Sequence, residues 1–76
     1  MKQADAEARR SKVVAFVAHF RAQYNVGPSY SEIAKNVGFG SPAAARKACQ
    51  ILVERGHLHK HDGISRSLYV PESASG

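Results

Sequence analysis

The order of apolar and polar residues predicts a first helix from Ser11 to Tyr24. Apolar side chains recur there at helical spacing, with charged and amide side chains between them, as in a helix with one buried face. This stripe consists of Val13, Phe16, Val17, Phe20 and Tyr24. The next four residues, Asn25-Val26-Gly27-Pro28, predict that the helix stops and the chain turns.

A second, short helix is predicted directly after this turn. Ser29 and Glu32 have the spacing of a capping box, in which each side chain bonds the backbone N–H of the other residue. Gly38 is the expected end of the helix, and Phe39-Gly40 forms the turn into the next one. We expect its buried side to consist of Ile33, Ala34 and Val37.

The third helix, from Pro42 to Arg55, has clear signals at both ends. Ser41 is a good N-cap, Pro42 suits the first helical position, and Gly56 suits the left-handed position after the last turn. Its apolar stripe comprises Ala44, Ala45, Ala48, Ile51 and Leu52. Below this helix we expect a core of Phe16, Phe20, Ile33, Ile51 and Leu52.

On the opposite face of the third helix, the first side chains are small and the following ones are basic. Ala43, Arg46, Lys47 and Gln50 share this face, with no acid before Glu54. A helix that enters the major groove of DNA needs a narrow N-terminal end and side chains that reach base edges and phosphates. A solvated basic surface is the alternative interpretation of the helix taken alone.

After Gly56 the apolar period changes from that of a helix to that of a strand. Residues 57–61 and 67–70 alternate, with Leu58, Leu68 and Val70 facing inward, and Asp62-Gly63 is a hairpin turn signal. The whole pattern predicts a mainly helical α+β fold, a winged helix-turn-helix of three helices and a β-hairpin wing. We expect a flexible or helical arm at 1–10, the domain at 11–70 and a disordered tail at 71–76.

Composition narrows the classes of function. The chain has 76 residues, a formal net charge of +5 and 43% hydrophobic residues, which fits one small folded domain with a polyanion as partner. The single cysteine, Cys49, allows no internal disulfide and suggests a reducing cytoplasm. No segment has the length and hydropathy of a membrane span.

The run PSYSEIAKNVGFGSPAAARKACQILVERGHL, followed by DGISRSLYV, resembles the N-terminal DNA-binding domain of the LexA repressor family. The resemblance extends from about residue 11 to 70. It implies a winged helix-turn-helix that binds operator DNA, as a homodimer on a palindromic site, and represses transcription. We expect no cofactor, no small-molecule ligand and no enzyme activity, and a cytoplasmic, nucleoid-associated protein.

The resemblance and the helix faces together give two sets of site residues. Those expected to contact bases are Ser41, Ala43, Ala44, Arg46, Lys47 and Gln50. Those expected to contact phosphates are Ser29, Tyr30, Ser31, Lys35, His59, Lys60, His61, Ser65 and Arg66.

The chain departs from LexA in two respects. Arg46 and Lys47 stand where LexA has an acidic pair; since these side chains donate to guanine whereas carboxylates accept from cytosine, we expect a different operator. The 76 residues also include no counterpart of the LexA self-cleavage domain. We therefore expect no self-cleavage from this chain, and a stand-alone regulator of the phage or plasmid kind.

Other interpretations are weaker. His57, His59 and His61 would share one face of a strand, an arrangement that can bind zinc or nickel, but a polar wing surface is the simpler explanation. Cys49 borders an apolar stripe and is expected to be a buried, inert thiol. The competing functions are a protein-interaction module with the same fold and an architectural or excisionase-like DNA binder that bends DNA with little sequence preference.

Overall fold

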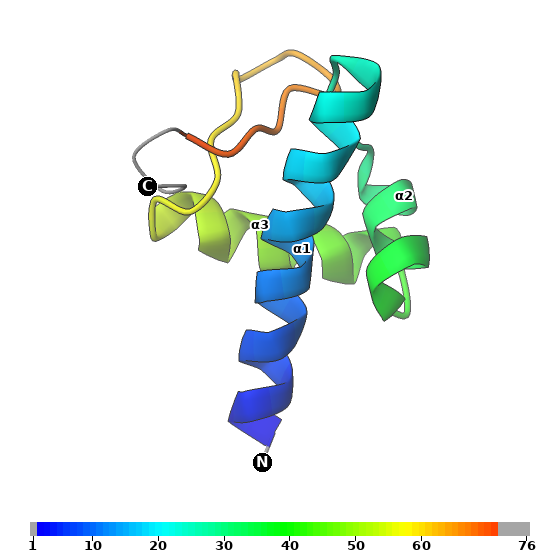
Figure 1. The fold of residues 1–76 in the computed structure, drawn as a ribbon. Helices are drawn as coiled ribbons and strands as arrows, with labels where there is room; N and C mark the ends of the chain where they lie inside the picture. Colours follow the sequence, from blue (N-terminus) through cyan, green and yellow to red (C-terminus); the bar gives the residue numbers. More distant parts are fainter. Residues whose placement is uncertain (1, 72–76) are drawn as a thin grey trace.

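A computed structural model describes residues 2–71, with side chains from residue 7 onward. Its helices are α1 (Lys2–Tyr24), α2 (Tyr30–Ile33), η1 (Ala34–Gly38) and α3 (Pro42–Glu54). In Figure 1, α1 crosses α3 at a steep angle, α2 and η1 lie beside them, and residues 57–70 return toward the end of α1. The mainly helical architecture was predicted correctly.

Of the two alternatives for the N-terminal arm, flexible or helical, the structure shows the helical one, and the first helix therefore starts before the expected Ser11. Helix α1 begins at Lys2, so the N-terminal arm is helical and continuous with the predicted helix. Residues 2–10 include three alanines and two arginines, which favour a helix, and contain no glycine or proline, so nothing interrupts the helix before Ser11. Of the predicted tail, only Pro71 belongs to the described residues.

The second helix begins as predicted, but its second half is a wider, π-helical turn. Both capping-box bonds are present: the Glu32 N–H donates to Ser29 Oγ at 3.1 Å, and the Ser29 N–H donates to Glu32 Oε1 at 2.8 Å. After Ile33 the chain forms one π-helical turn, η1, which ends at Gly38 with φ +103°. The side-chain amide of Asn36 donates to the Glu32 carbonyl at 2.8 Å, competing for the acceptor that a regular α-turn would use.

Helix α3 has the predicted cap at its start and ends one residue earlier than predicted, at Glu54. Ser41 Oγ accepts from the Ala44 N–H at 3.2 Å. At the other end Gly56 has φ +82°, and its N–H bonds the Val53 carbonyl at 3.1 Å. The His57 N–H bonds the Leu52 carbonyl at 2.9 Å, which completes a Schellman motif.

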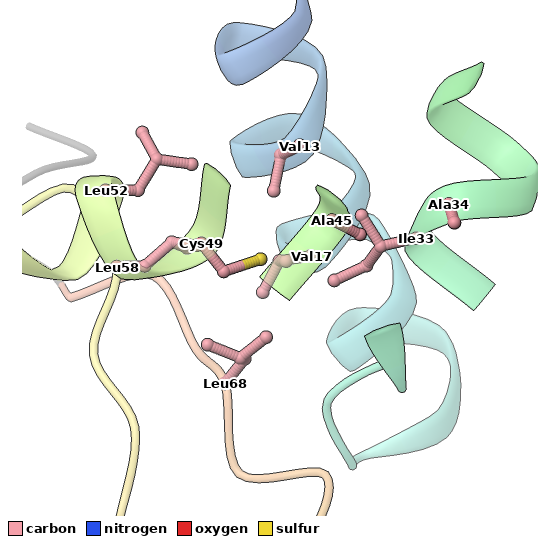
Figure 2. Close-up of a cluster of buried hydrophobic side chains, with 9 residues drawn as sticks. All are labelled: Val13, Val17, Ile33, Ala34, Ala45, Cys49, Leu52, Leu58 and Leu68. Carbon is pink, nitrogen blue, oxygen red and sulfur yellow. The ribbon is translucent and has the colours of Figure 1, made fainter. Parts of the chain in front are cut away.

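The core lies where α1 crosses α3, and the C-terminal segment covers it (Figure 2). Val13 and Val17 of α1 and Ala45 of α3 are fully buried. No aromatic ring is among the buried residues of the described chain. The remaining members of the cluster are Ile33, Ala34, Cys49, Leu52, Leu58 and Leu68.

The predicted core was correct for Ile33 and Leu52, and Phe16 packs against it, but Phe20 and Ile51 are not among its members. Phe16 and Phe20 are only partly buried, as is Ile51, and Tyr24 is 56% exposed. The three rings instead form a row along one flank of α1. Phe16 and Phe20 have ring centroids 5.7 Å apart, and Phe20 and Tyr24 4.6 Å apart. Ala44, placed on the apolar stripe from sequence, is exposed.

Residues 57–70 contain the predicted turn but not the predicted strands. Within the described part of the chain the only β pairing is one antiparallel bridge, in which His59 and Tyr69 exchange two backbone bonds of 2.9 Å. The next pair in this register is His61 and Ser67, where the Ser67 hydroxyl replaces the backbone. It accepts from the His61 N–H at 3.0 Å and donates to the His61 carbonyl at 3.1 Å.

The register of this segment nevertheless agrees with the sequence. Leu58 and Leu68 are buried, and Val70 packs against the core. Gly63 has φ +77° in the predicted turn, where the Ile64 N–H donates to the His61 carbonyl at 3.2 Å. The segment is therefore a loosely paired hairpin whose apolar residues hold it on the core.

Candidate nucleic-acid interface

The exposed face of α3 carries every residue predicted to contact bases. Since Ala45, Ala48, Cys49 and Leu52 point into the core, the opposite side of the helix is open to solvent. On or beside it lie the exposed residues Ser41, Ala43, Ala44, Arg46, Lys47 and Gln50. The two alanines add little bulk to the first turn, so a partner surface can approach the backbone of α3 closely there.

An open groove joins α3 to the hairpin, and we call it the wing groove. It brings together Arg46 of α3, residues 28–30 at the start of α2, and the hairpin loop. Seven predicted site residues line it, one from the base-contacting set and six from the phosphate-contacting set: Ser29, Tyr30, Arg46, Lys60, His61, Ser65 and Arg66. These residues come from separate parts of the sequence, and the fold brings them together on one surface.

A second hollow continues this surface along α3. Gln50 and Glu54 of α3, Tyr30 of α2 and Lys60 of the hairpin line it. Lys60 thus borders both hollows and lies between the helix and the loop. Together with Arg46 and Arg66 it makes one side of the domain basic, as a polyanion-binding surface requires.

Three predicted phosphate-contacting residues lie outside these hollows. Ser31 and Lys35 are exposed on α2 and η1. His59 is exposed on the outer side of the hairpin, where its ring centroid lies 5.6 Å from that of Tyr69. Lys47, predicted to contact bases, is exposed on α3 and lines neither hollow.

The ring of Tyr69 lies at the centre of a cluster of side chains that the sequence did not suggest. The His61 ring stacks on it with a centroid distance of 5.6 Å and an angle of 25° between the planes. On α1, the Arg21 guanidinium lies 5.7 Å from the Tyr69 centroid and donates to the Leu68 carbonyl at 3.4 Å. Alternation placed Tyr69 and His61 on one side of the hairpin, but only the fold brings Arg21 to them.

An ion pair connects the hairpin to the second helix. Arg66 NH1 lies 2.8 Å from Glu32 Oε1, the same carboxylate oxygen that caps α2. The hydrogen bond from the Ser29 N–H is the main cause that lowers the pKa of Glu32, and Arg66 adds to it. The carboxylate is therefore charged at neutral pH, and the sequence showed only its capping role.

The described residues contain no group of three histidine, cysteine, aspartate or glutamate side chains placed to hold a metal ion. His59 and His61 contact Tyr69, whereas His57 lines a different hollow, between α1 and α3. Cys49 is 1% exposed, and burial raises the pKa of its thiol to about 11, so it is unreactive in the folded chain as predicted.

No helix of the described chain has both the length and the apolar character needed to cross a membrane.

Comparison with known proteins agrees with this geometry. The sequence model of the family described as the LexA DNA binding domain matches residues 5–67. LexA repressors from Glaesserella parasuis serovar 5 (strain SH0165) and Actinobacillus pleuropneumoniae serotype 5b (strain L20) are 30% and 32% identical to the chain. These matches cover 92% and 83% of it. A LexA repressor from Pseudomonas aeruginosa (strain LESB58) is 29% identical over 83% of the chain.

The matches cover only 34%, 30% and 31% of these three relatives, so the chain corresponds to about a third of their length. The matched region includes most of α1, all of α2, η1 and α3, and most of the hairpin segment. The family is a DNA-binding module, which points to a regulator and not to an enzyme. The chain belongs to the LexA DNA-binding domain family.

Proposed function

We propose that this protein is a sequence-specific regulator of transcription, and specifically a repressor, that binds double-stranded DNA through α3 and the hairpin. The observation that carries the proposal is the wing groove, in which Arg46 of the exposed α3 face shares one surface with Lys60 and Arg66. A helix with a slim N-terminal end beside a basic loop suits a major groove flanked by phosphates. The LexA repressors among its relatives support the repressor role.

In this proposal α3 supplies the base contacts. Its first turn, with Ser41, Ala43 and Ala44, lies closest to the base edges. Arg46, Lys47 and Gln50 then present long donors on the same exposed side. Arg46 is the expected principal contact because its planar guanidinium can donate two hydrogen bonds to guanine O6 and N7, whereas lysine acts as a point charge.

The remaining site residues would contact the DNA backbone. Residues 57–70 act as the wing, and the wing groove follows one strand of the duplex. Phosphate contacts position a protein without distinguishing sequences, so these residues contribute affinity and its salt dependence. They are Ser29, Tyr30, Ser31, Lys35, His59, Lys60, His61, Ser65 and Arg66.

Two further features are part of the proposal. The protein would bind a palindromic operator as a homodimer, because two-fold symmetry is the usual way in which a small helix-turn-helix domain doubles its contacts. It would act in the cytoplasm, at the nucleoid, where its DNA is.

Selection of bound duplexes from random DNA tests this function, followed by competition binding at fixed salt. We expect one preferred sequence with guanine at the Arg46 position. Arg46→Ala should cost about 1–3 kcal/mol on that sequence and much less on a scrambled duplex. Equal losses on both duplexes would make Arg46 a phosphate contact.

The selection also distinguishes the competing functions. An architectural protein would bind and bend DNA while recovering no preferred sequence. A protein-interaction module would show only weak binding that is insensitive to sequence. Either result would contradict the proposed regulator.

A further inference from the structure

The Glu32 carboxylate holds two parts of the DNA-facing surface at once. Its Oε1 accepts from the Ser29 N–H at 2.8 Å, which caps α2, and from Arg66 NH1 at 2.8 Å, which comes from the hairpin loop. Ser29 and Arg66 both line the wing groove. Glu32 is therefore the point at which the wall formed by α2 is joined to the wall formed by the loop.

The backbone around Arg66 is held in the same place. Arg66 has φ +54°, an unfavourable conformation for a residue with a side chain, and its carbonyl accepts from the Gly27 N–H at 2.9 Å. Gly27 lies so close to the loop that an added Cβ would be 3.0 Å from this carbonyl oxygen. The direction in which Arg66 leaves the loop is thus set by the turn between α1 and α2.

The ion pair leaves Arg66 able to bind an anion. A guanidinium has five N–H donors, and Glu32 engages only those of NH1. The Arg66 side chain is 46% exposed, on the groove wall. Its Nε and NH2 donors remain for a second partner, and the geometry is that of an arginine oriented by a carboxylate behind it.

We propose that Glu32 is a positioning residue for DNA binding, which orients Arg66 toward a backbone phosphate and holds the wing against the helix-turn-helix. The proposal rests on the proposed DNA binding and adds to it. Glu32 itself does not touch DNA in this arrangement; it acts through Arg66.

The sign of the effect separates this role from simple electrostatics. A negative charge beside a DNA-binding groove repels phosphates, so removing it should tighten binding if charge were its only effect. If Glu32 orients Arg66, removing its charge should weaken binding instead, because the Arg66 side chain loses its fixed direction.

The test uses Glu32→Gln, which keeps an oxygen to cap α2 but removes the charge, together with Arg66→Ala and the double variant. Binding to a fluorescein-labelled duplex of random sequence is measured by anisotropy over a range of salt concentrations, since phosphate contacts are independent of sequence. We expect Glu32→Gln to weaken binding about threefold to fivefold, the size of an exposed ion-pair coupling. It should have no effect, or a slight tightening, in the Arg66→Ala background.

Glu54→Gln is the matched control, because Glu54 is an exposed acid on the DNA-facing side of α3 with no ion pair among the described residues. It should tighten binding slightly. Thermal unfolding of each variant is measured alongside. If Glu32→Gln tightened binding as Glu54→Gln does, or weakened it equally in the Arg66→Ala background, the positioning role would be wrong. Failure of the unmodified protein to bind the duplex would instead contradict the proposed DNA binding.

Discussion

Helix α3 and the hairpin segment 57–70 form the two sides of the same surface, but they are held in different ways. The ends of α3 are closed by bonds within residues 41–57, from the Ser41 cap to the Schellman motif at Gly56. The hairpin has one backbone bridge of its own, at His59 and Tyr69. Its other bonds to the rest of the domain reach Leu52 at the end of α3 and, farther away in the sequence, Arg21, Gly27 and Glu32.

This difference matters for DNA binding. The residues proposed to contact bases lie on an element whose geometry is set locally, so their spacing is rigid. Five of the residues proposed to contact phosphates lie on the hairpin segment, whose position depends on neighbours distant in sequence: His59, Lys60, His61, Ser65 and Arg66. Changes in α1, or in the turn between α1 and α2, should therefore alter affinity through the wing while leaving the helix and its sequence preference intact.

The largest expected effect is on the core that both regions share. Leu52 is 4% exposed and lies beside Leu58 and Leu68 in the buried cluster. Leu52→Ala should lower the free energy of unfolding by about 2–5 kcal/mol, measured by urea denaturation. Ile51→Ala, on the half-buried side of the same turn, is the control and should cost less. Equal losses would mean that the faces of α3 are assigned wrongly.

The second prediction concerns a substitution that displaces the hairpin without changing any residue of α3. A Cβ at Gly27 would lie 2.5 Å from the Leu68 carbonyl oxygen and 2.9 Å from its nitrogen, so the backbone of the hairpin must move. Gly27→Ala should cost about 1–3 kcal/mol of unfolding free energy. It should also weaken binding to all duplexes alike, in a competition assay with preferred and scrambled sequences.

Gly40 provides the control for this substitution. A Cβ there meets no atom within 4 Å, so Gly40→Ala should leave both stability and binding unchanged. A Gly27→Ala protein that changed its preferred sequence would show that the hairpin and α3 are coupled more tightly than the contacts suggest.

A smaller effect is expected at Ser67, whose hydroxyl closes the hairpin in place of a backbone pair. Ser67→Ala leaves the His61 N–H and carbonyl without this partner and should cost about 0.5–1.5 kcal/mol. Hydrogen exchange at the His61 amide should become faster, as followed by NMR. Ser65→Ala, at an exposed position in the same loop, should change stability by less than about 0.5 kcal/mol.

The last effect is absent at neutral pH, appears only in alkaline solution, and concerns a residue of α3. The pKa of the Cys49 thiol is raised from 9.0 to about 11 by burial, so above pH 9 the unfolded chain loses this proton before the folded chain does. The free energy of unfolding should therefore fall as the pH rises from 9 toward 11. A Cys49→Ala variant should show a shallower decline, and an equal decline would mean that the thiol does not contribute.

The sequence alone determined the features that depend on neighbouring residues. The Ser41 cap, the Gly56 end and the Ser29–Glu32 capping box are bonds between residues close in the chain, and all are present. Alternation also predicted the register of the hairpin correctly, because one face must be buried. The exposed face of α3 followed from the helical spacing of its apolar residues.

Only the tertiary structure decided the contacts between distant segments. Helical spacing grouped Val13 and Val17 with Phe16 and Phe20, but the packing of α1 buries the two valines fully and leaves the two rings only partly buried. The extent of strand pairing, the wing groove and the bond between Glu32 and Arg66 likewise depend on how whole elements pack. Glu32 and Arg66 are 34 positions apart in the sequence, and Arg21 and Leu68, which also form a hydrogen bond, are 47 positions apart. At such separations no local pattern specifies a partner.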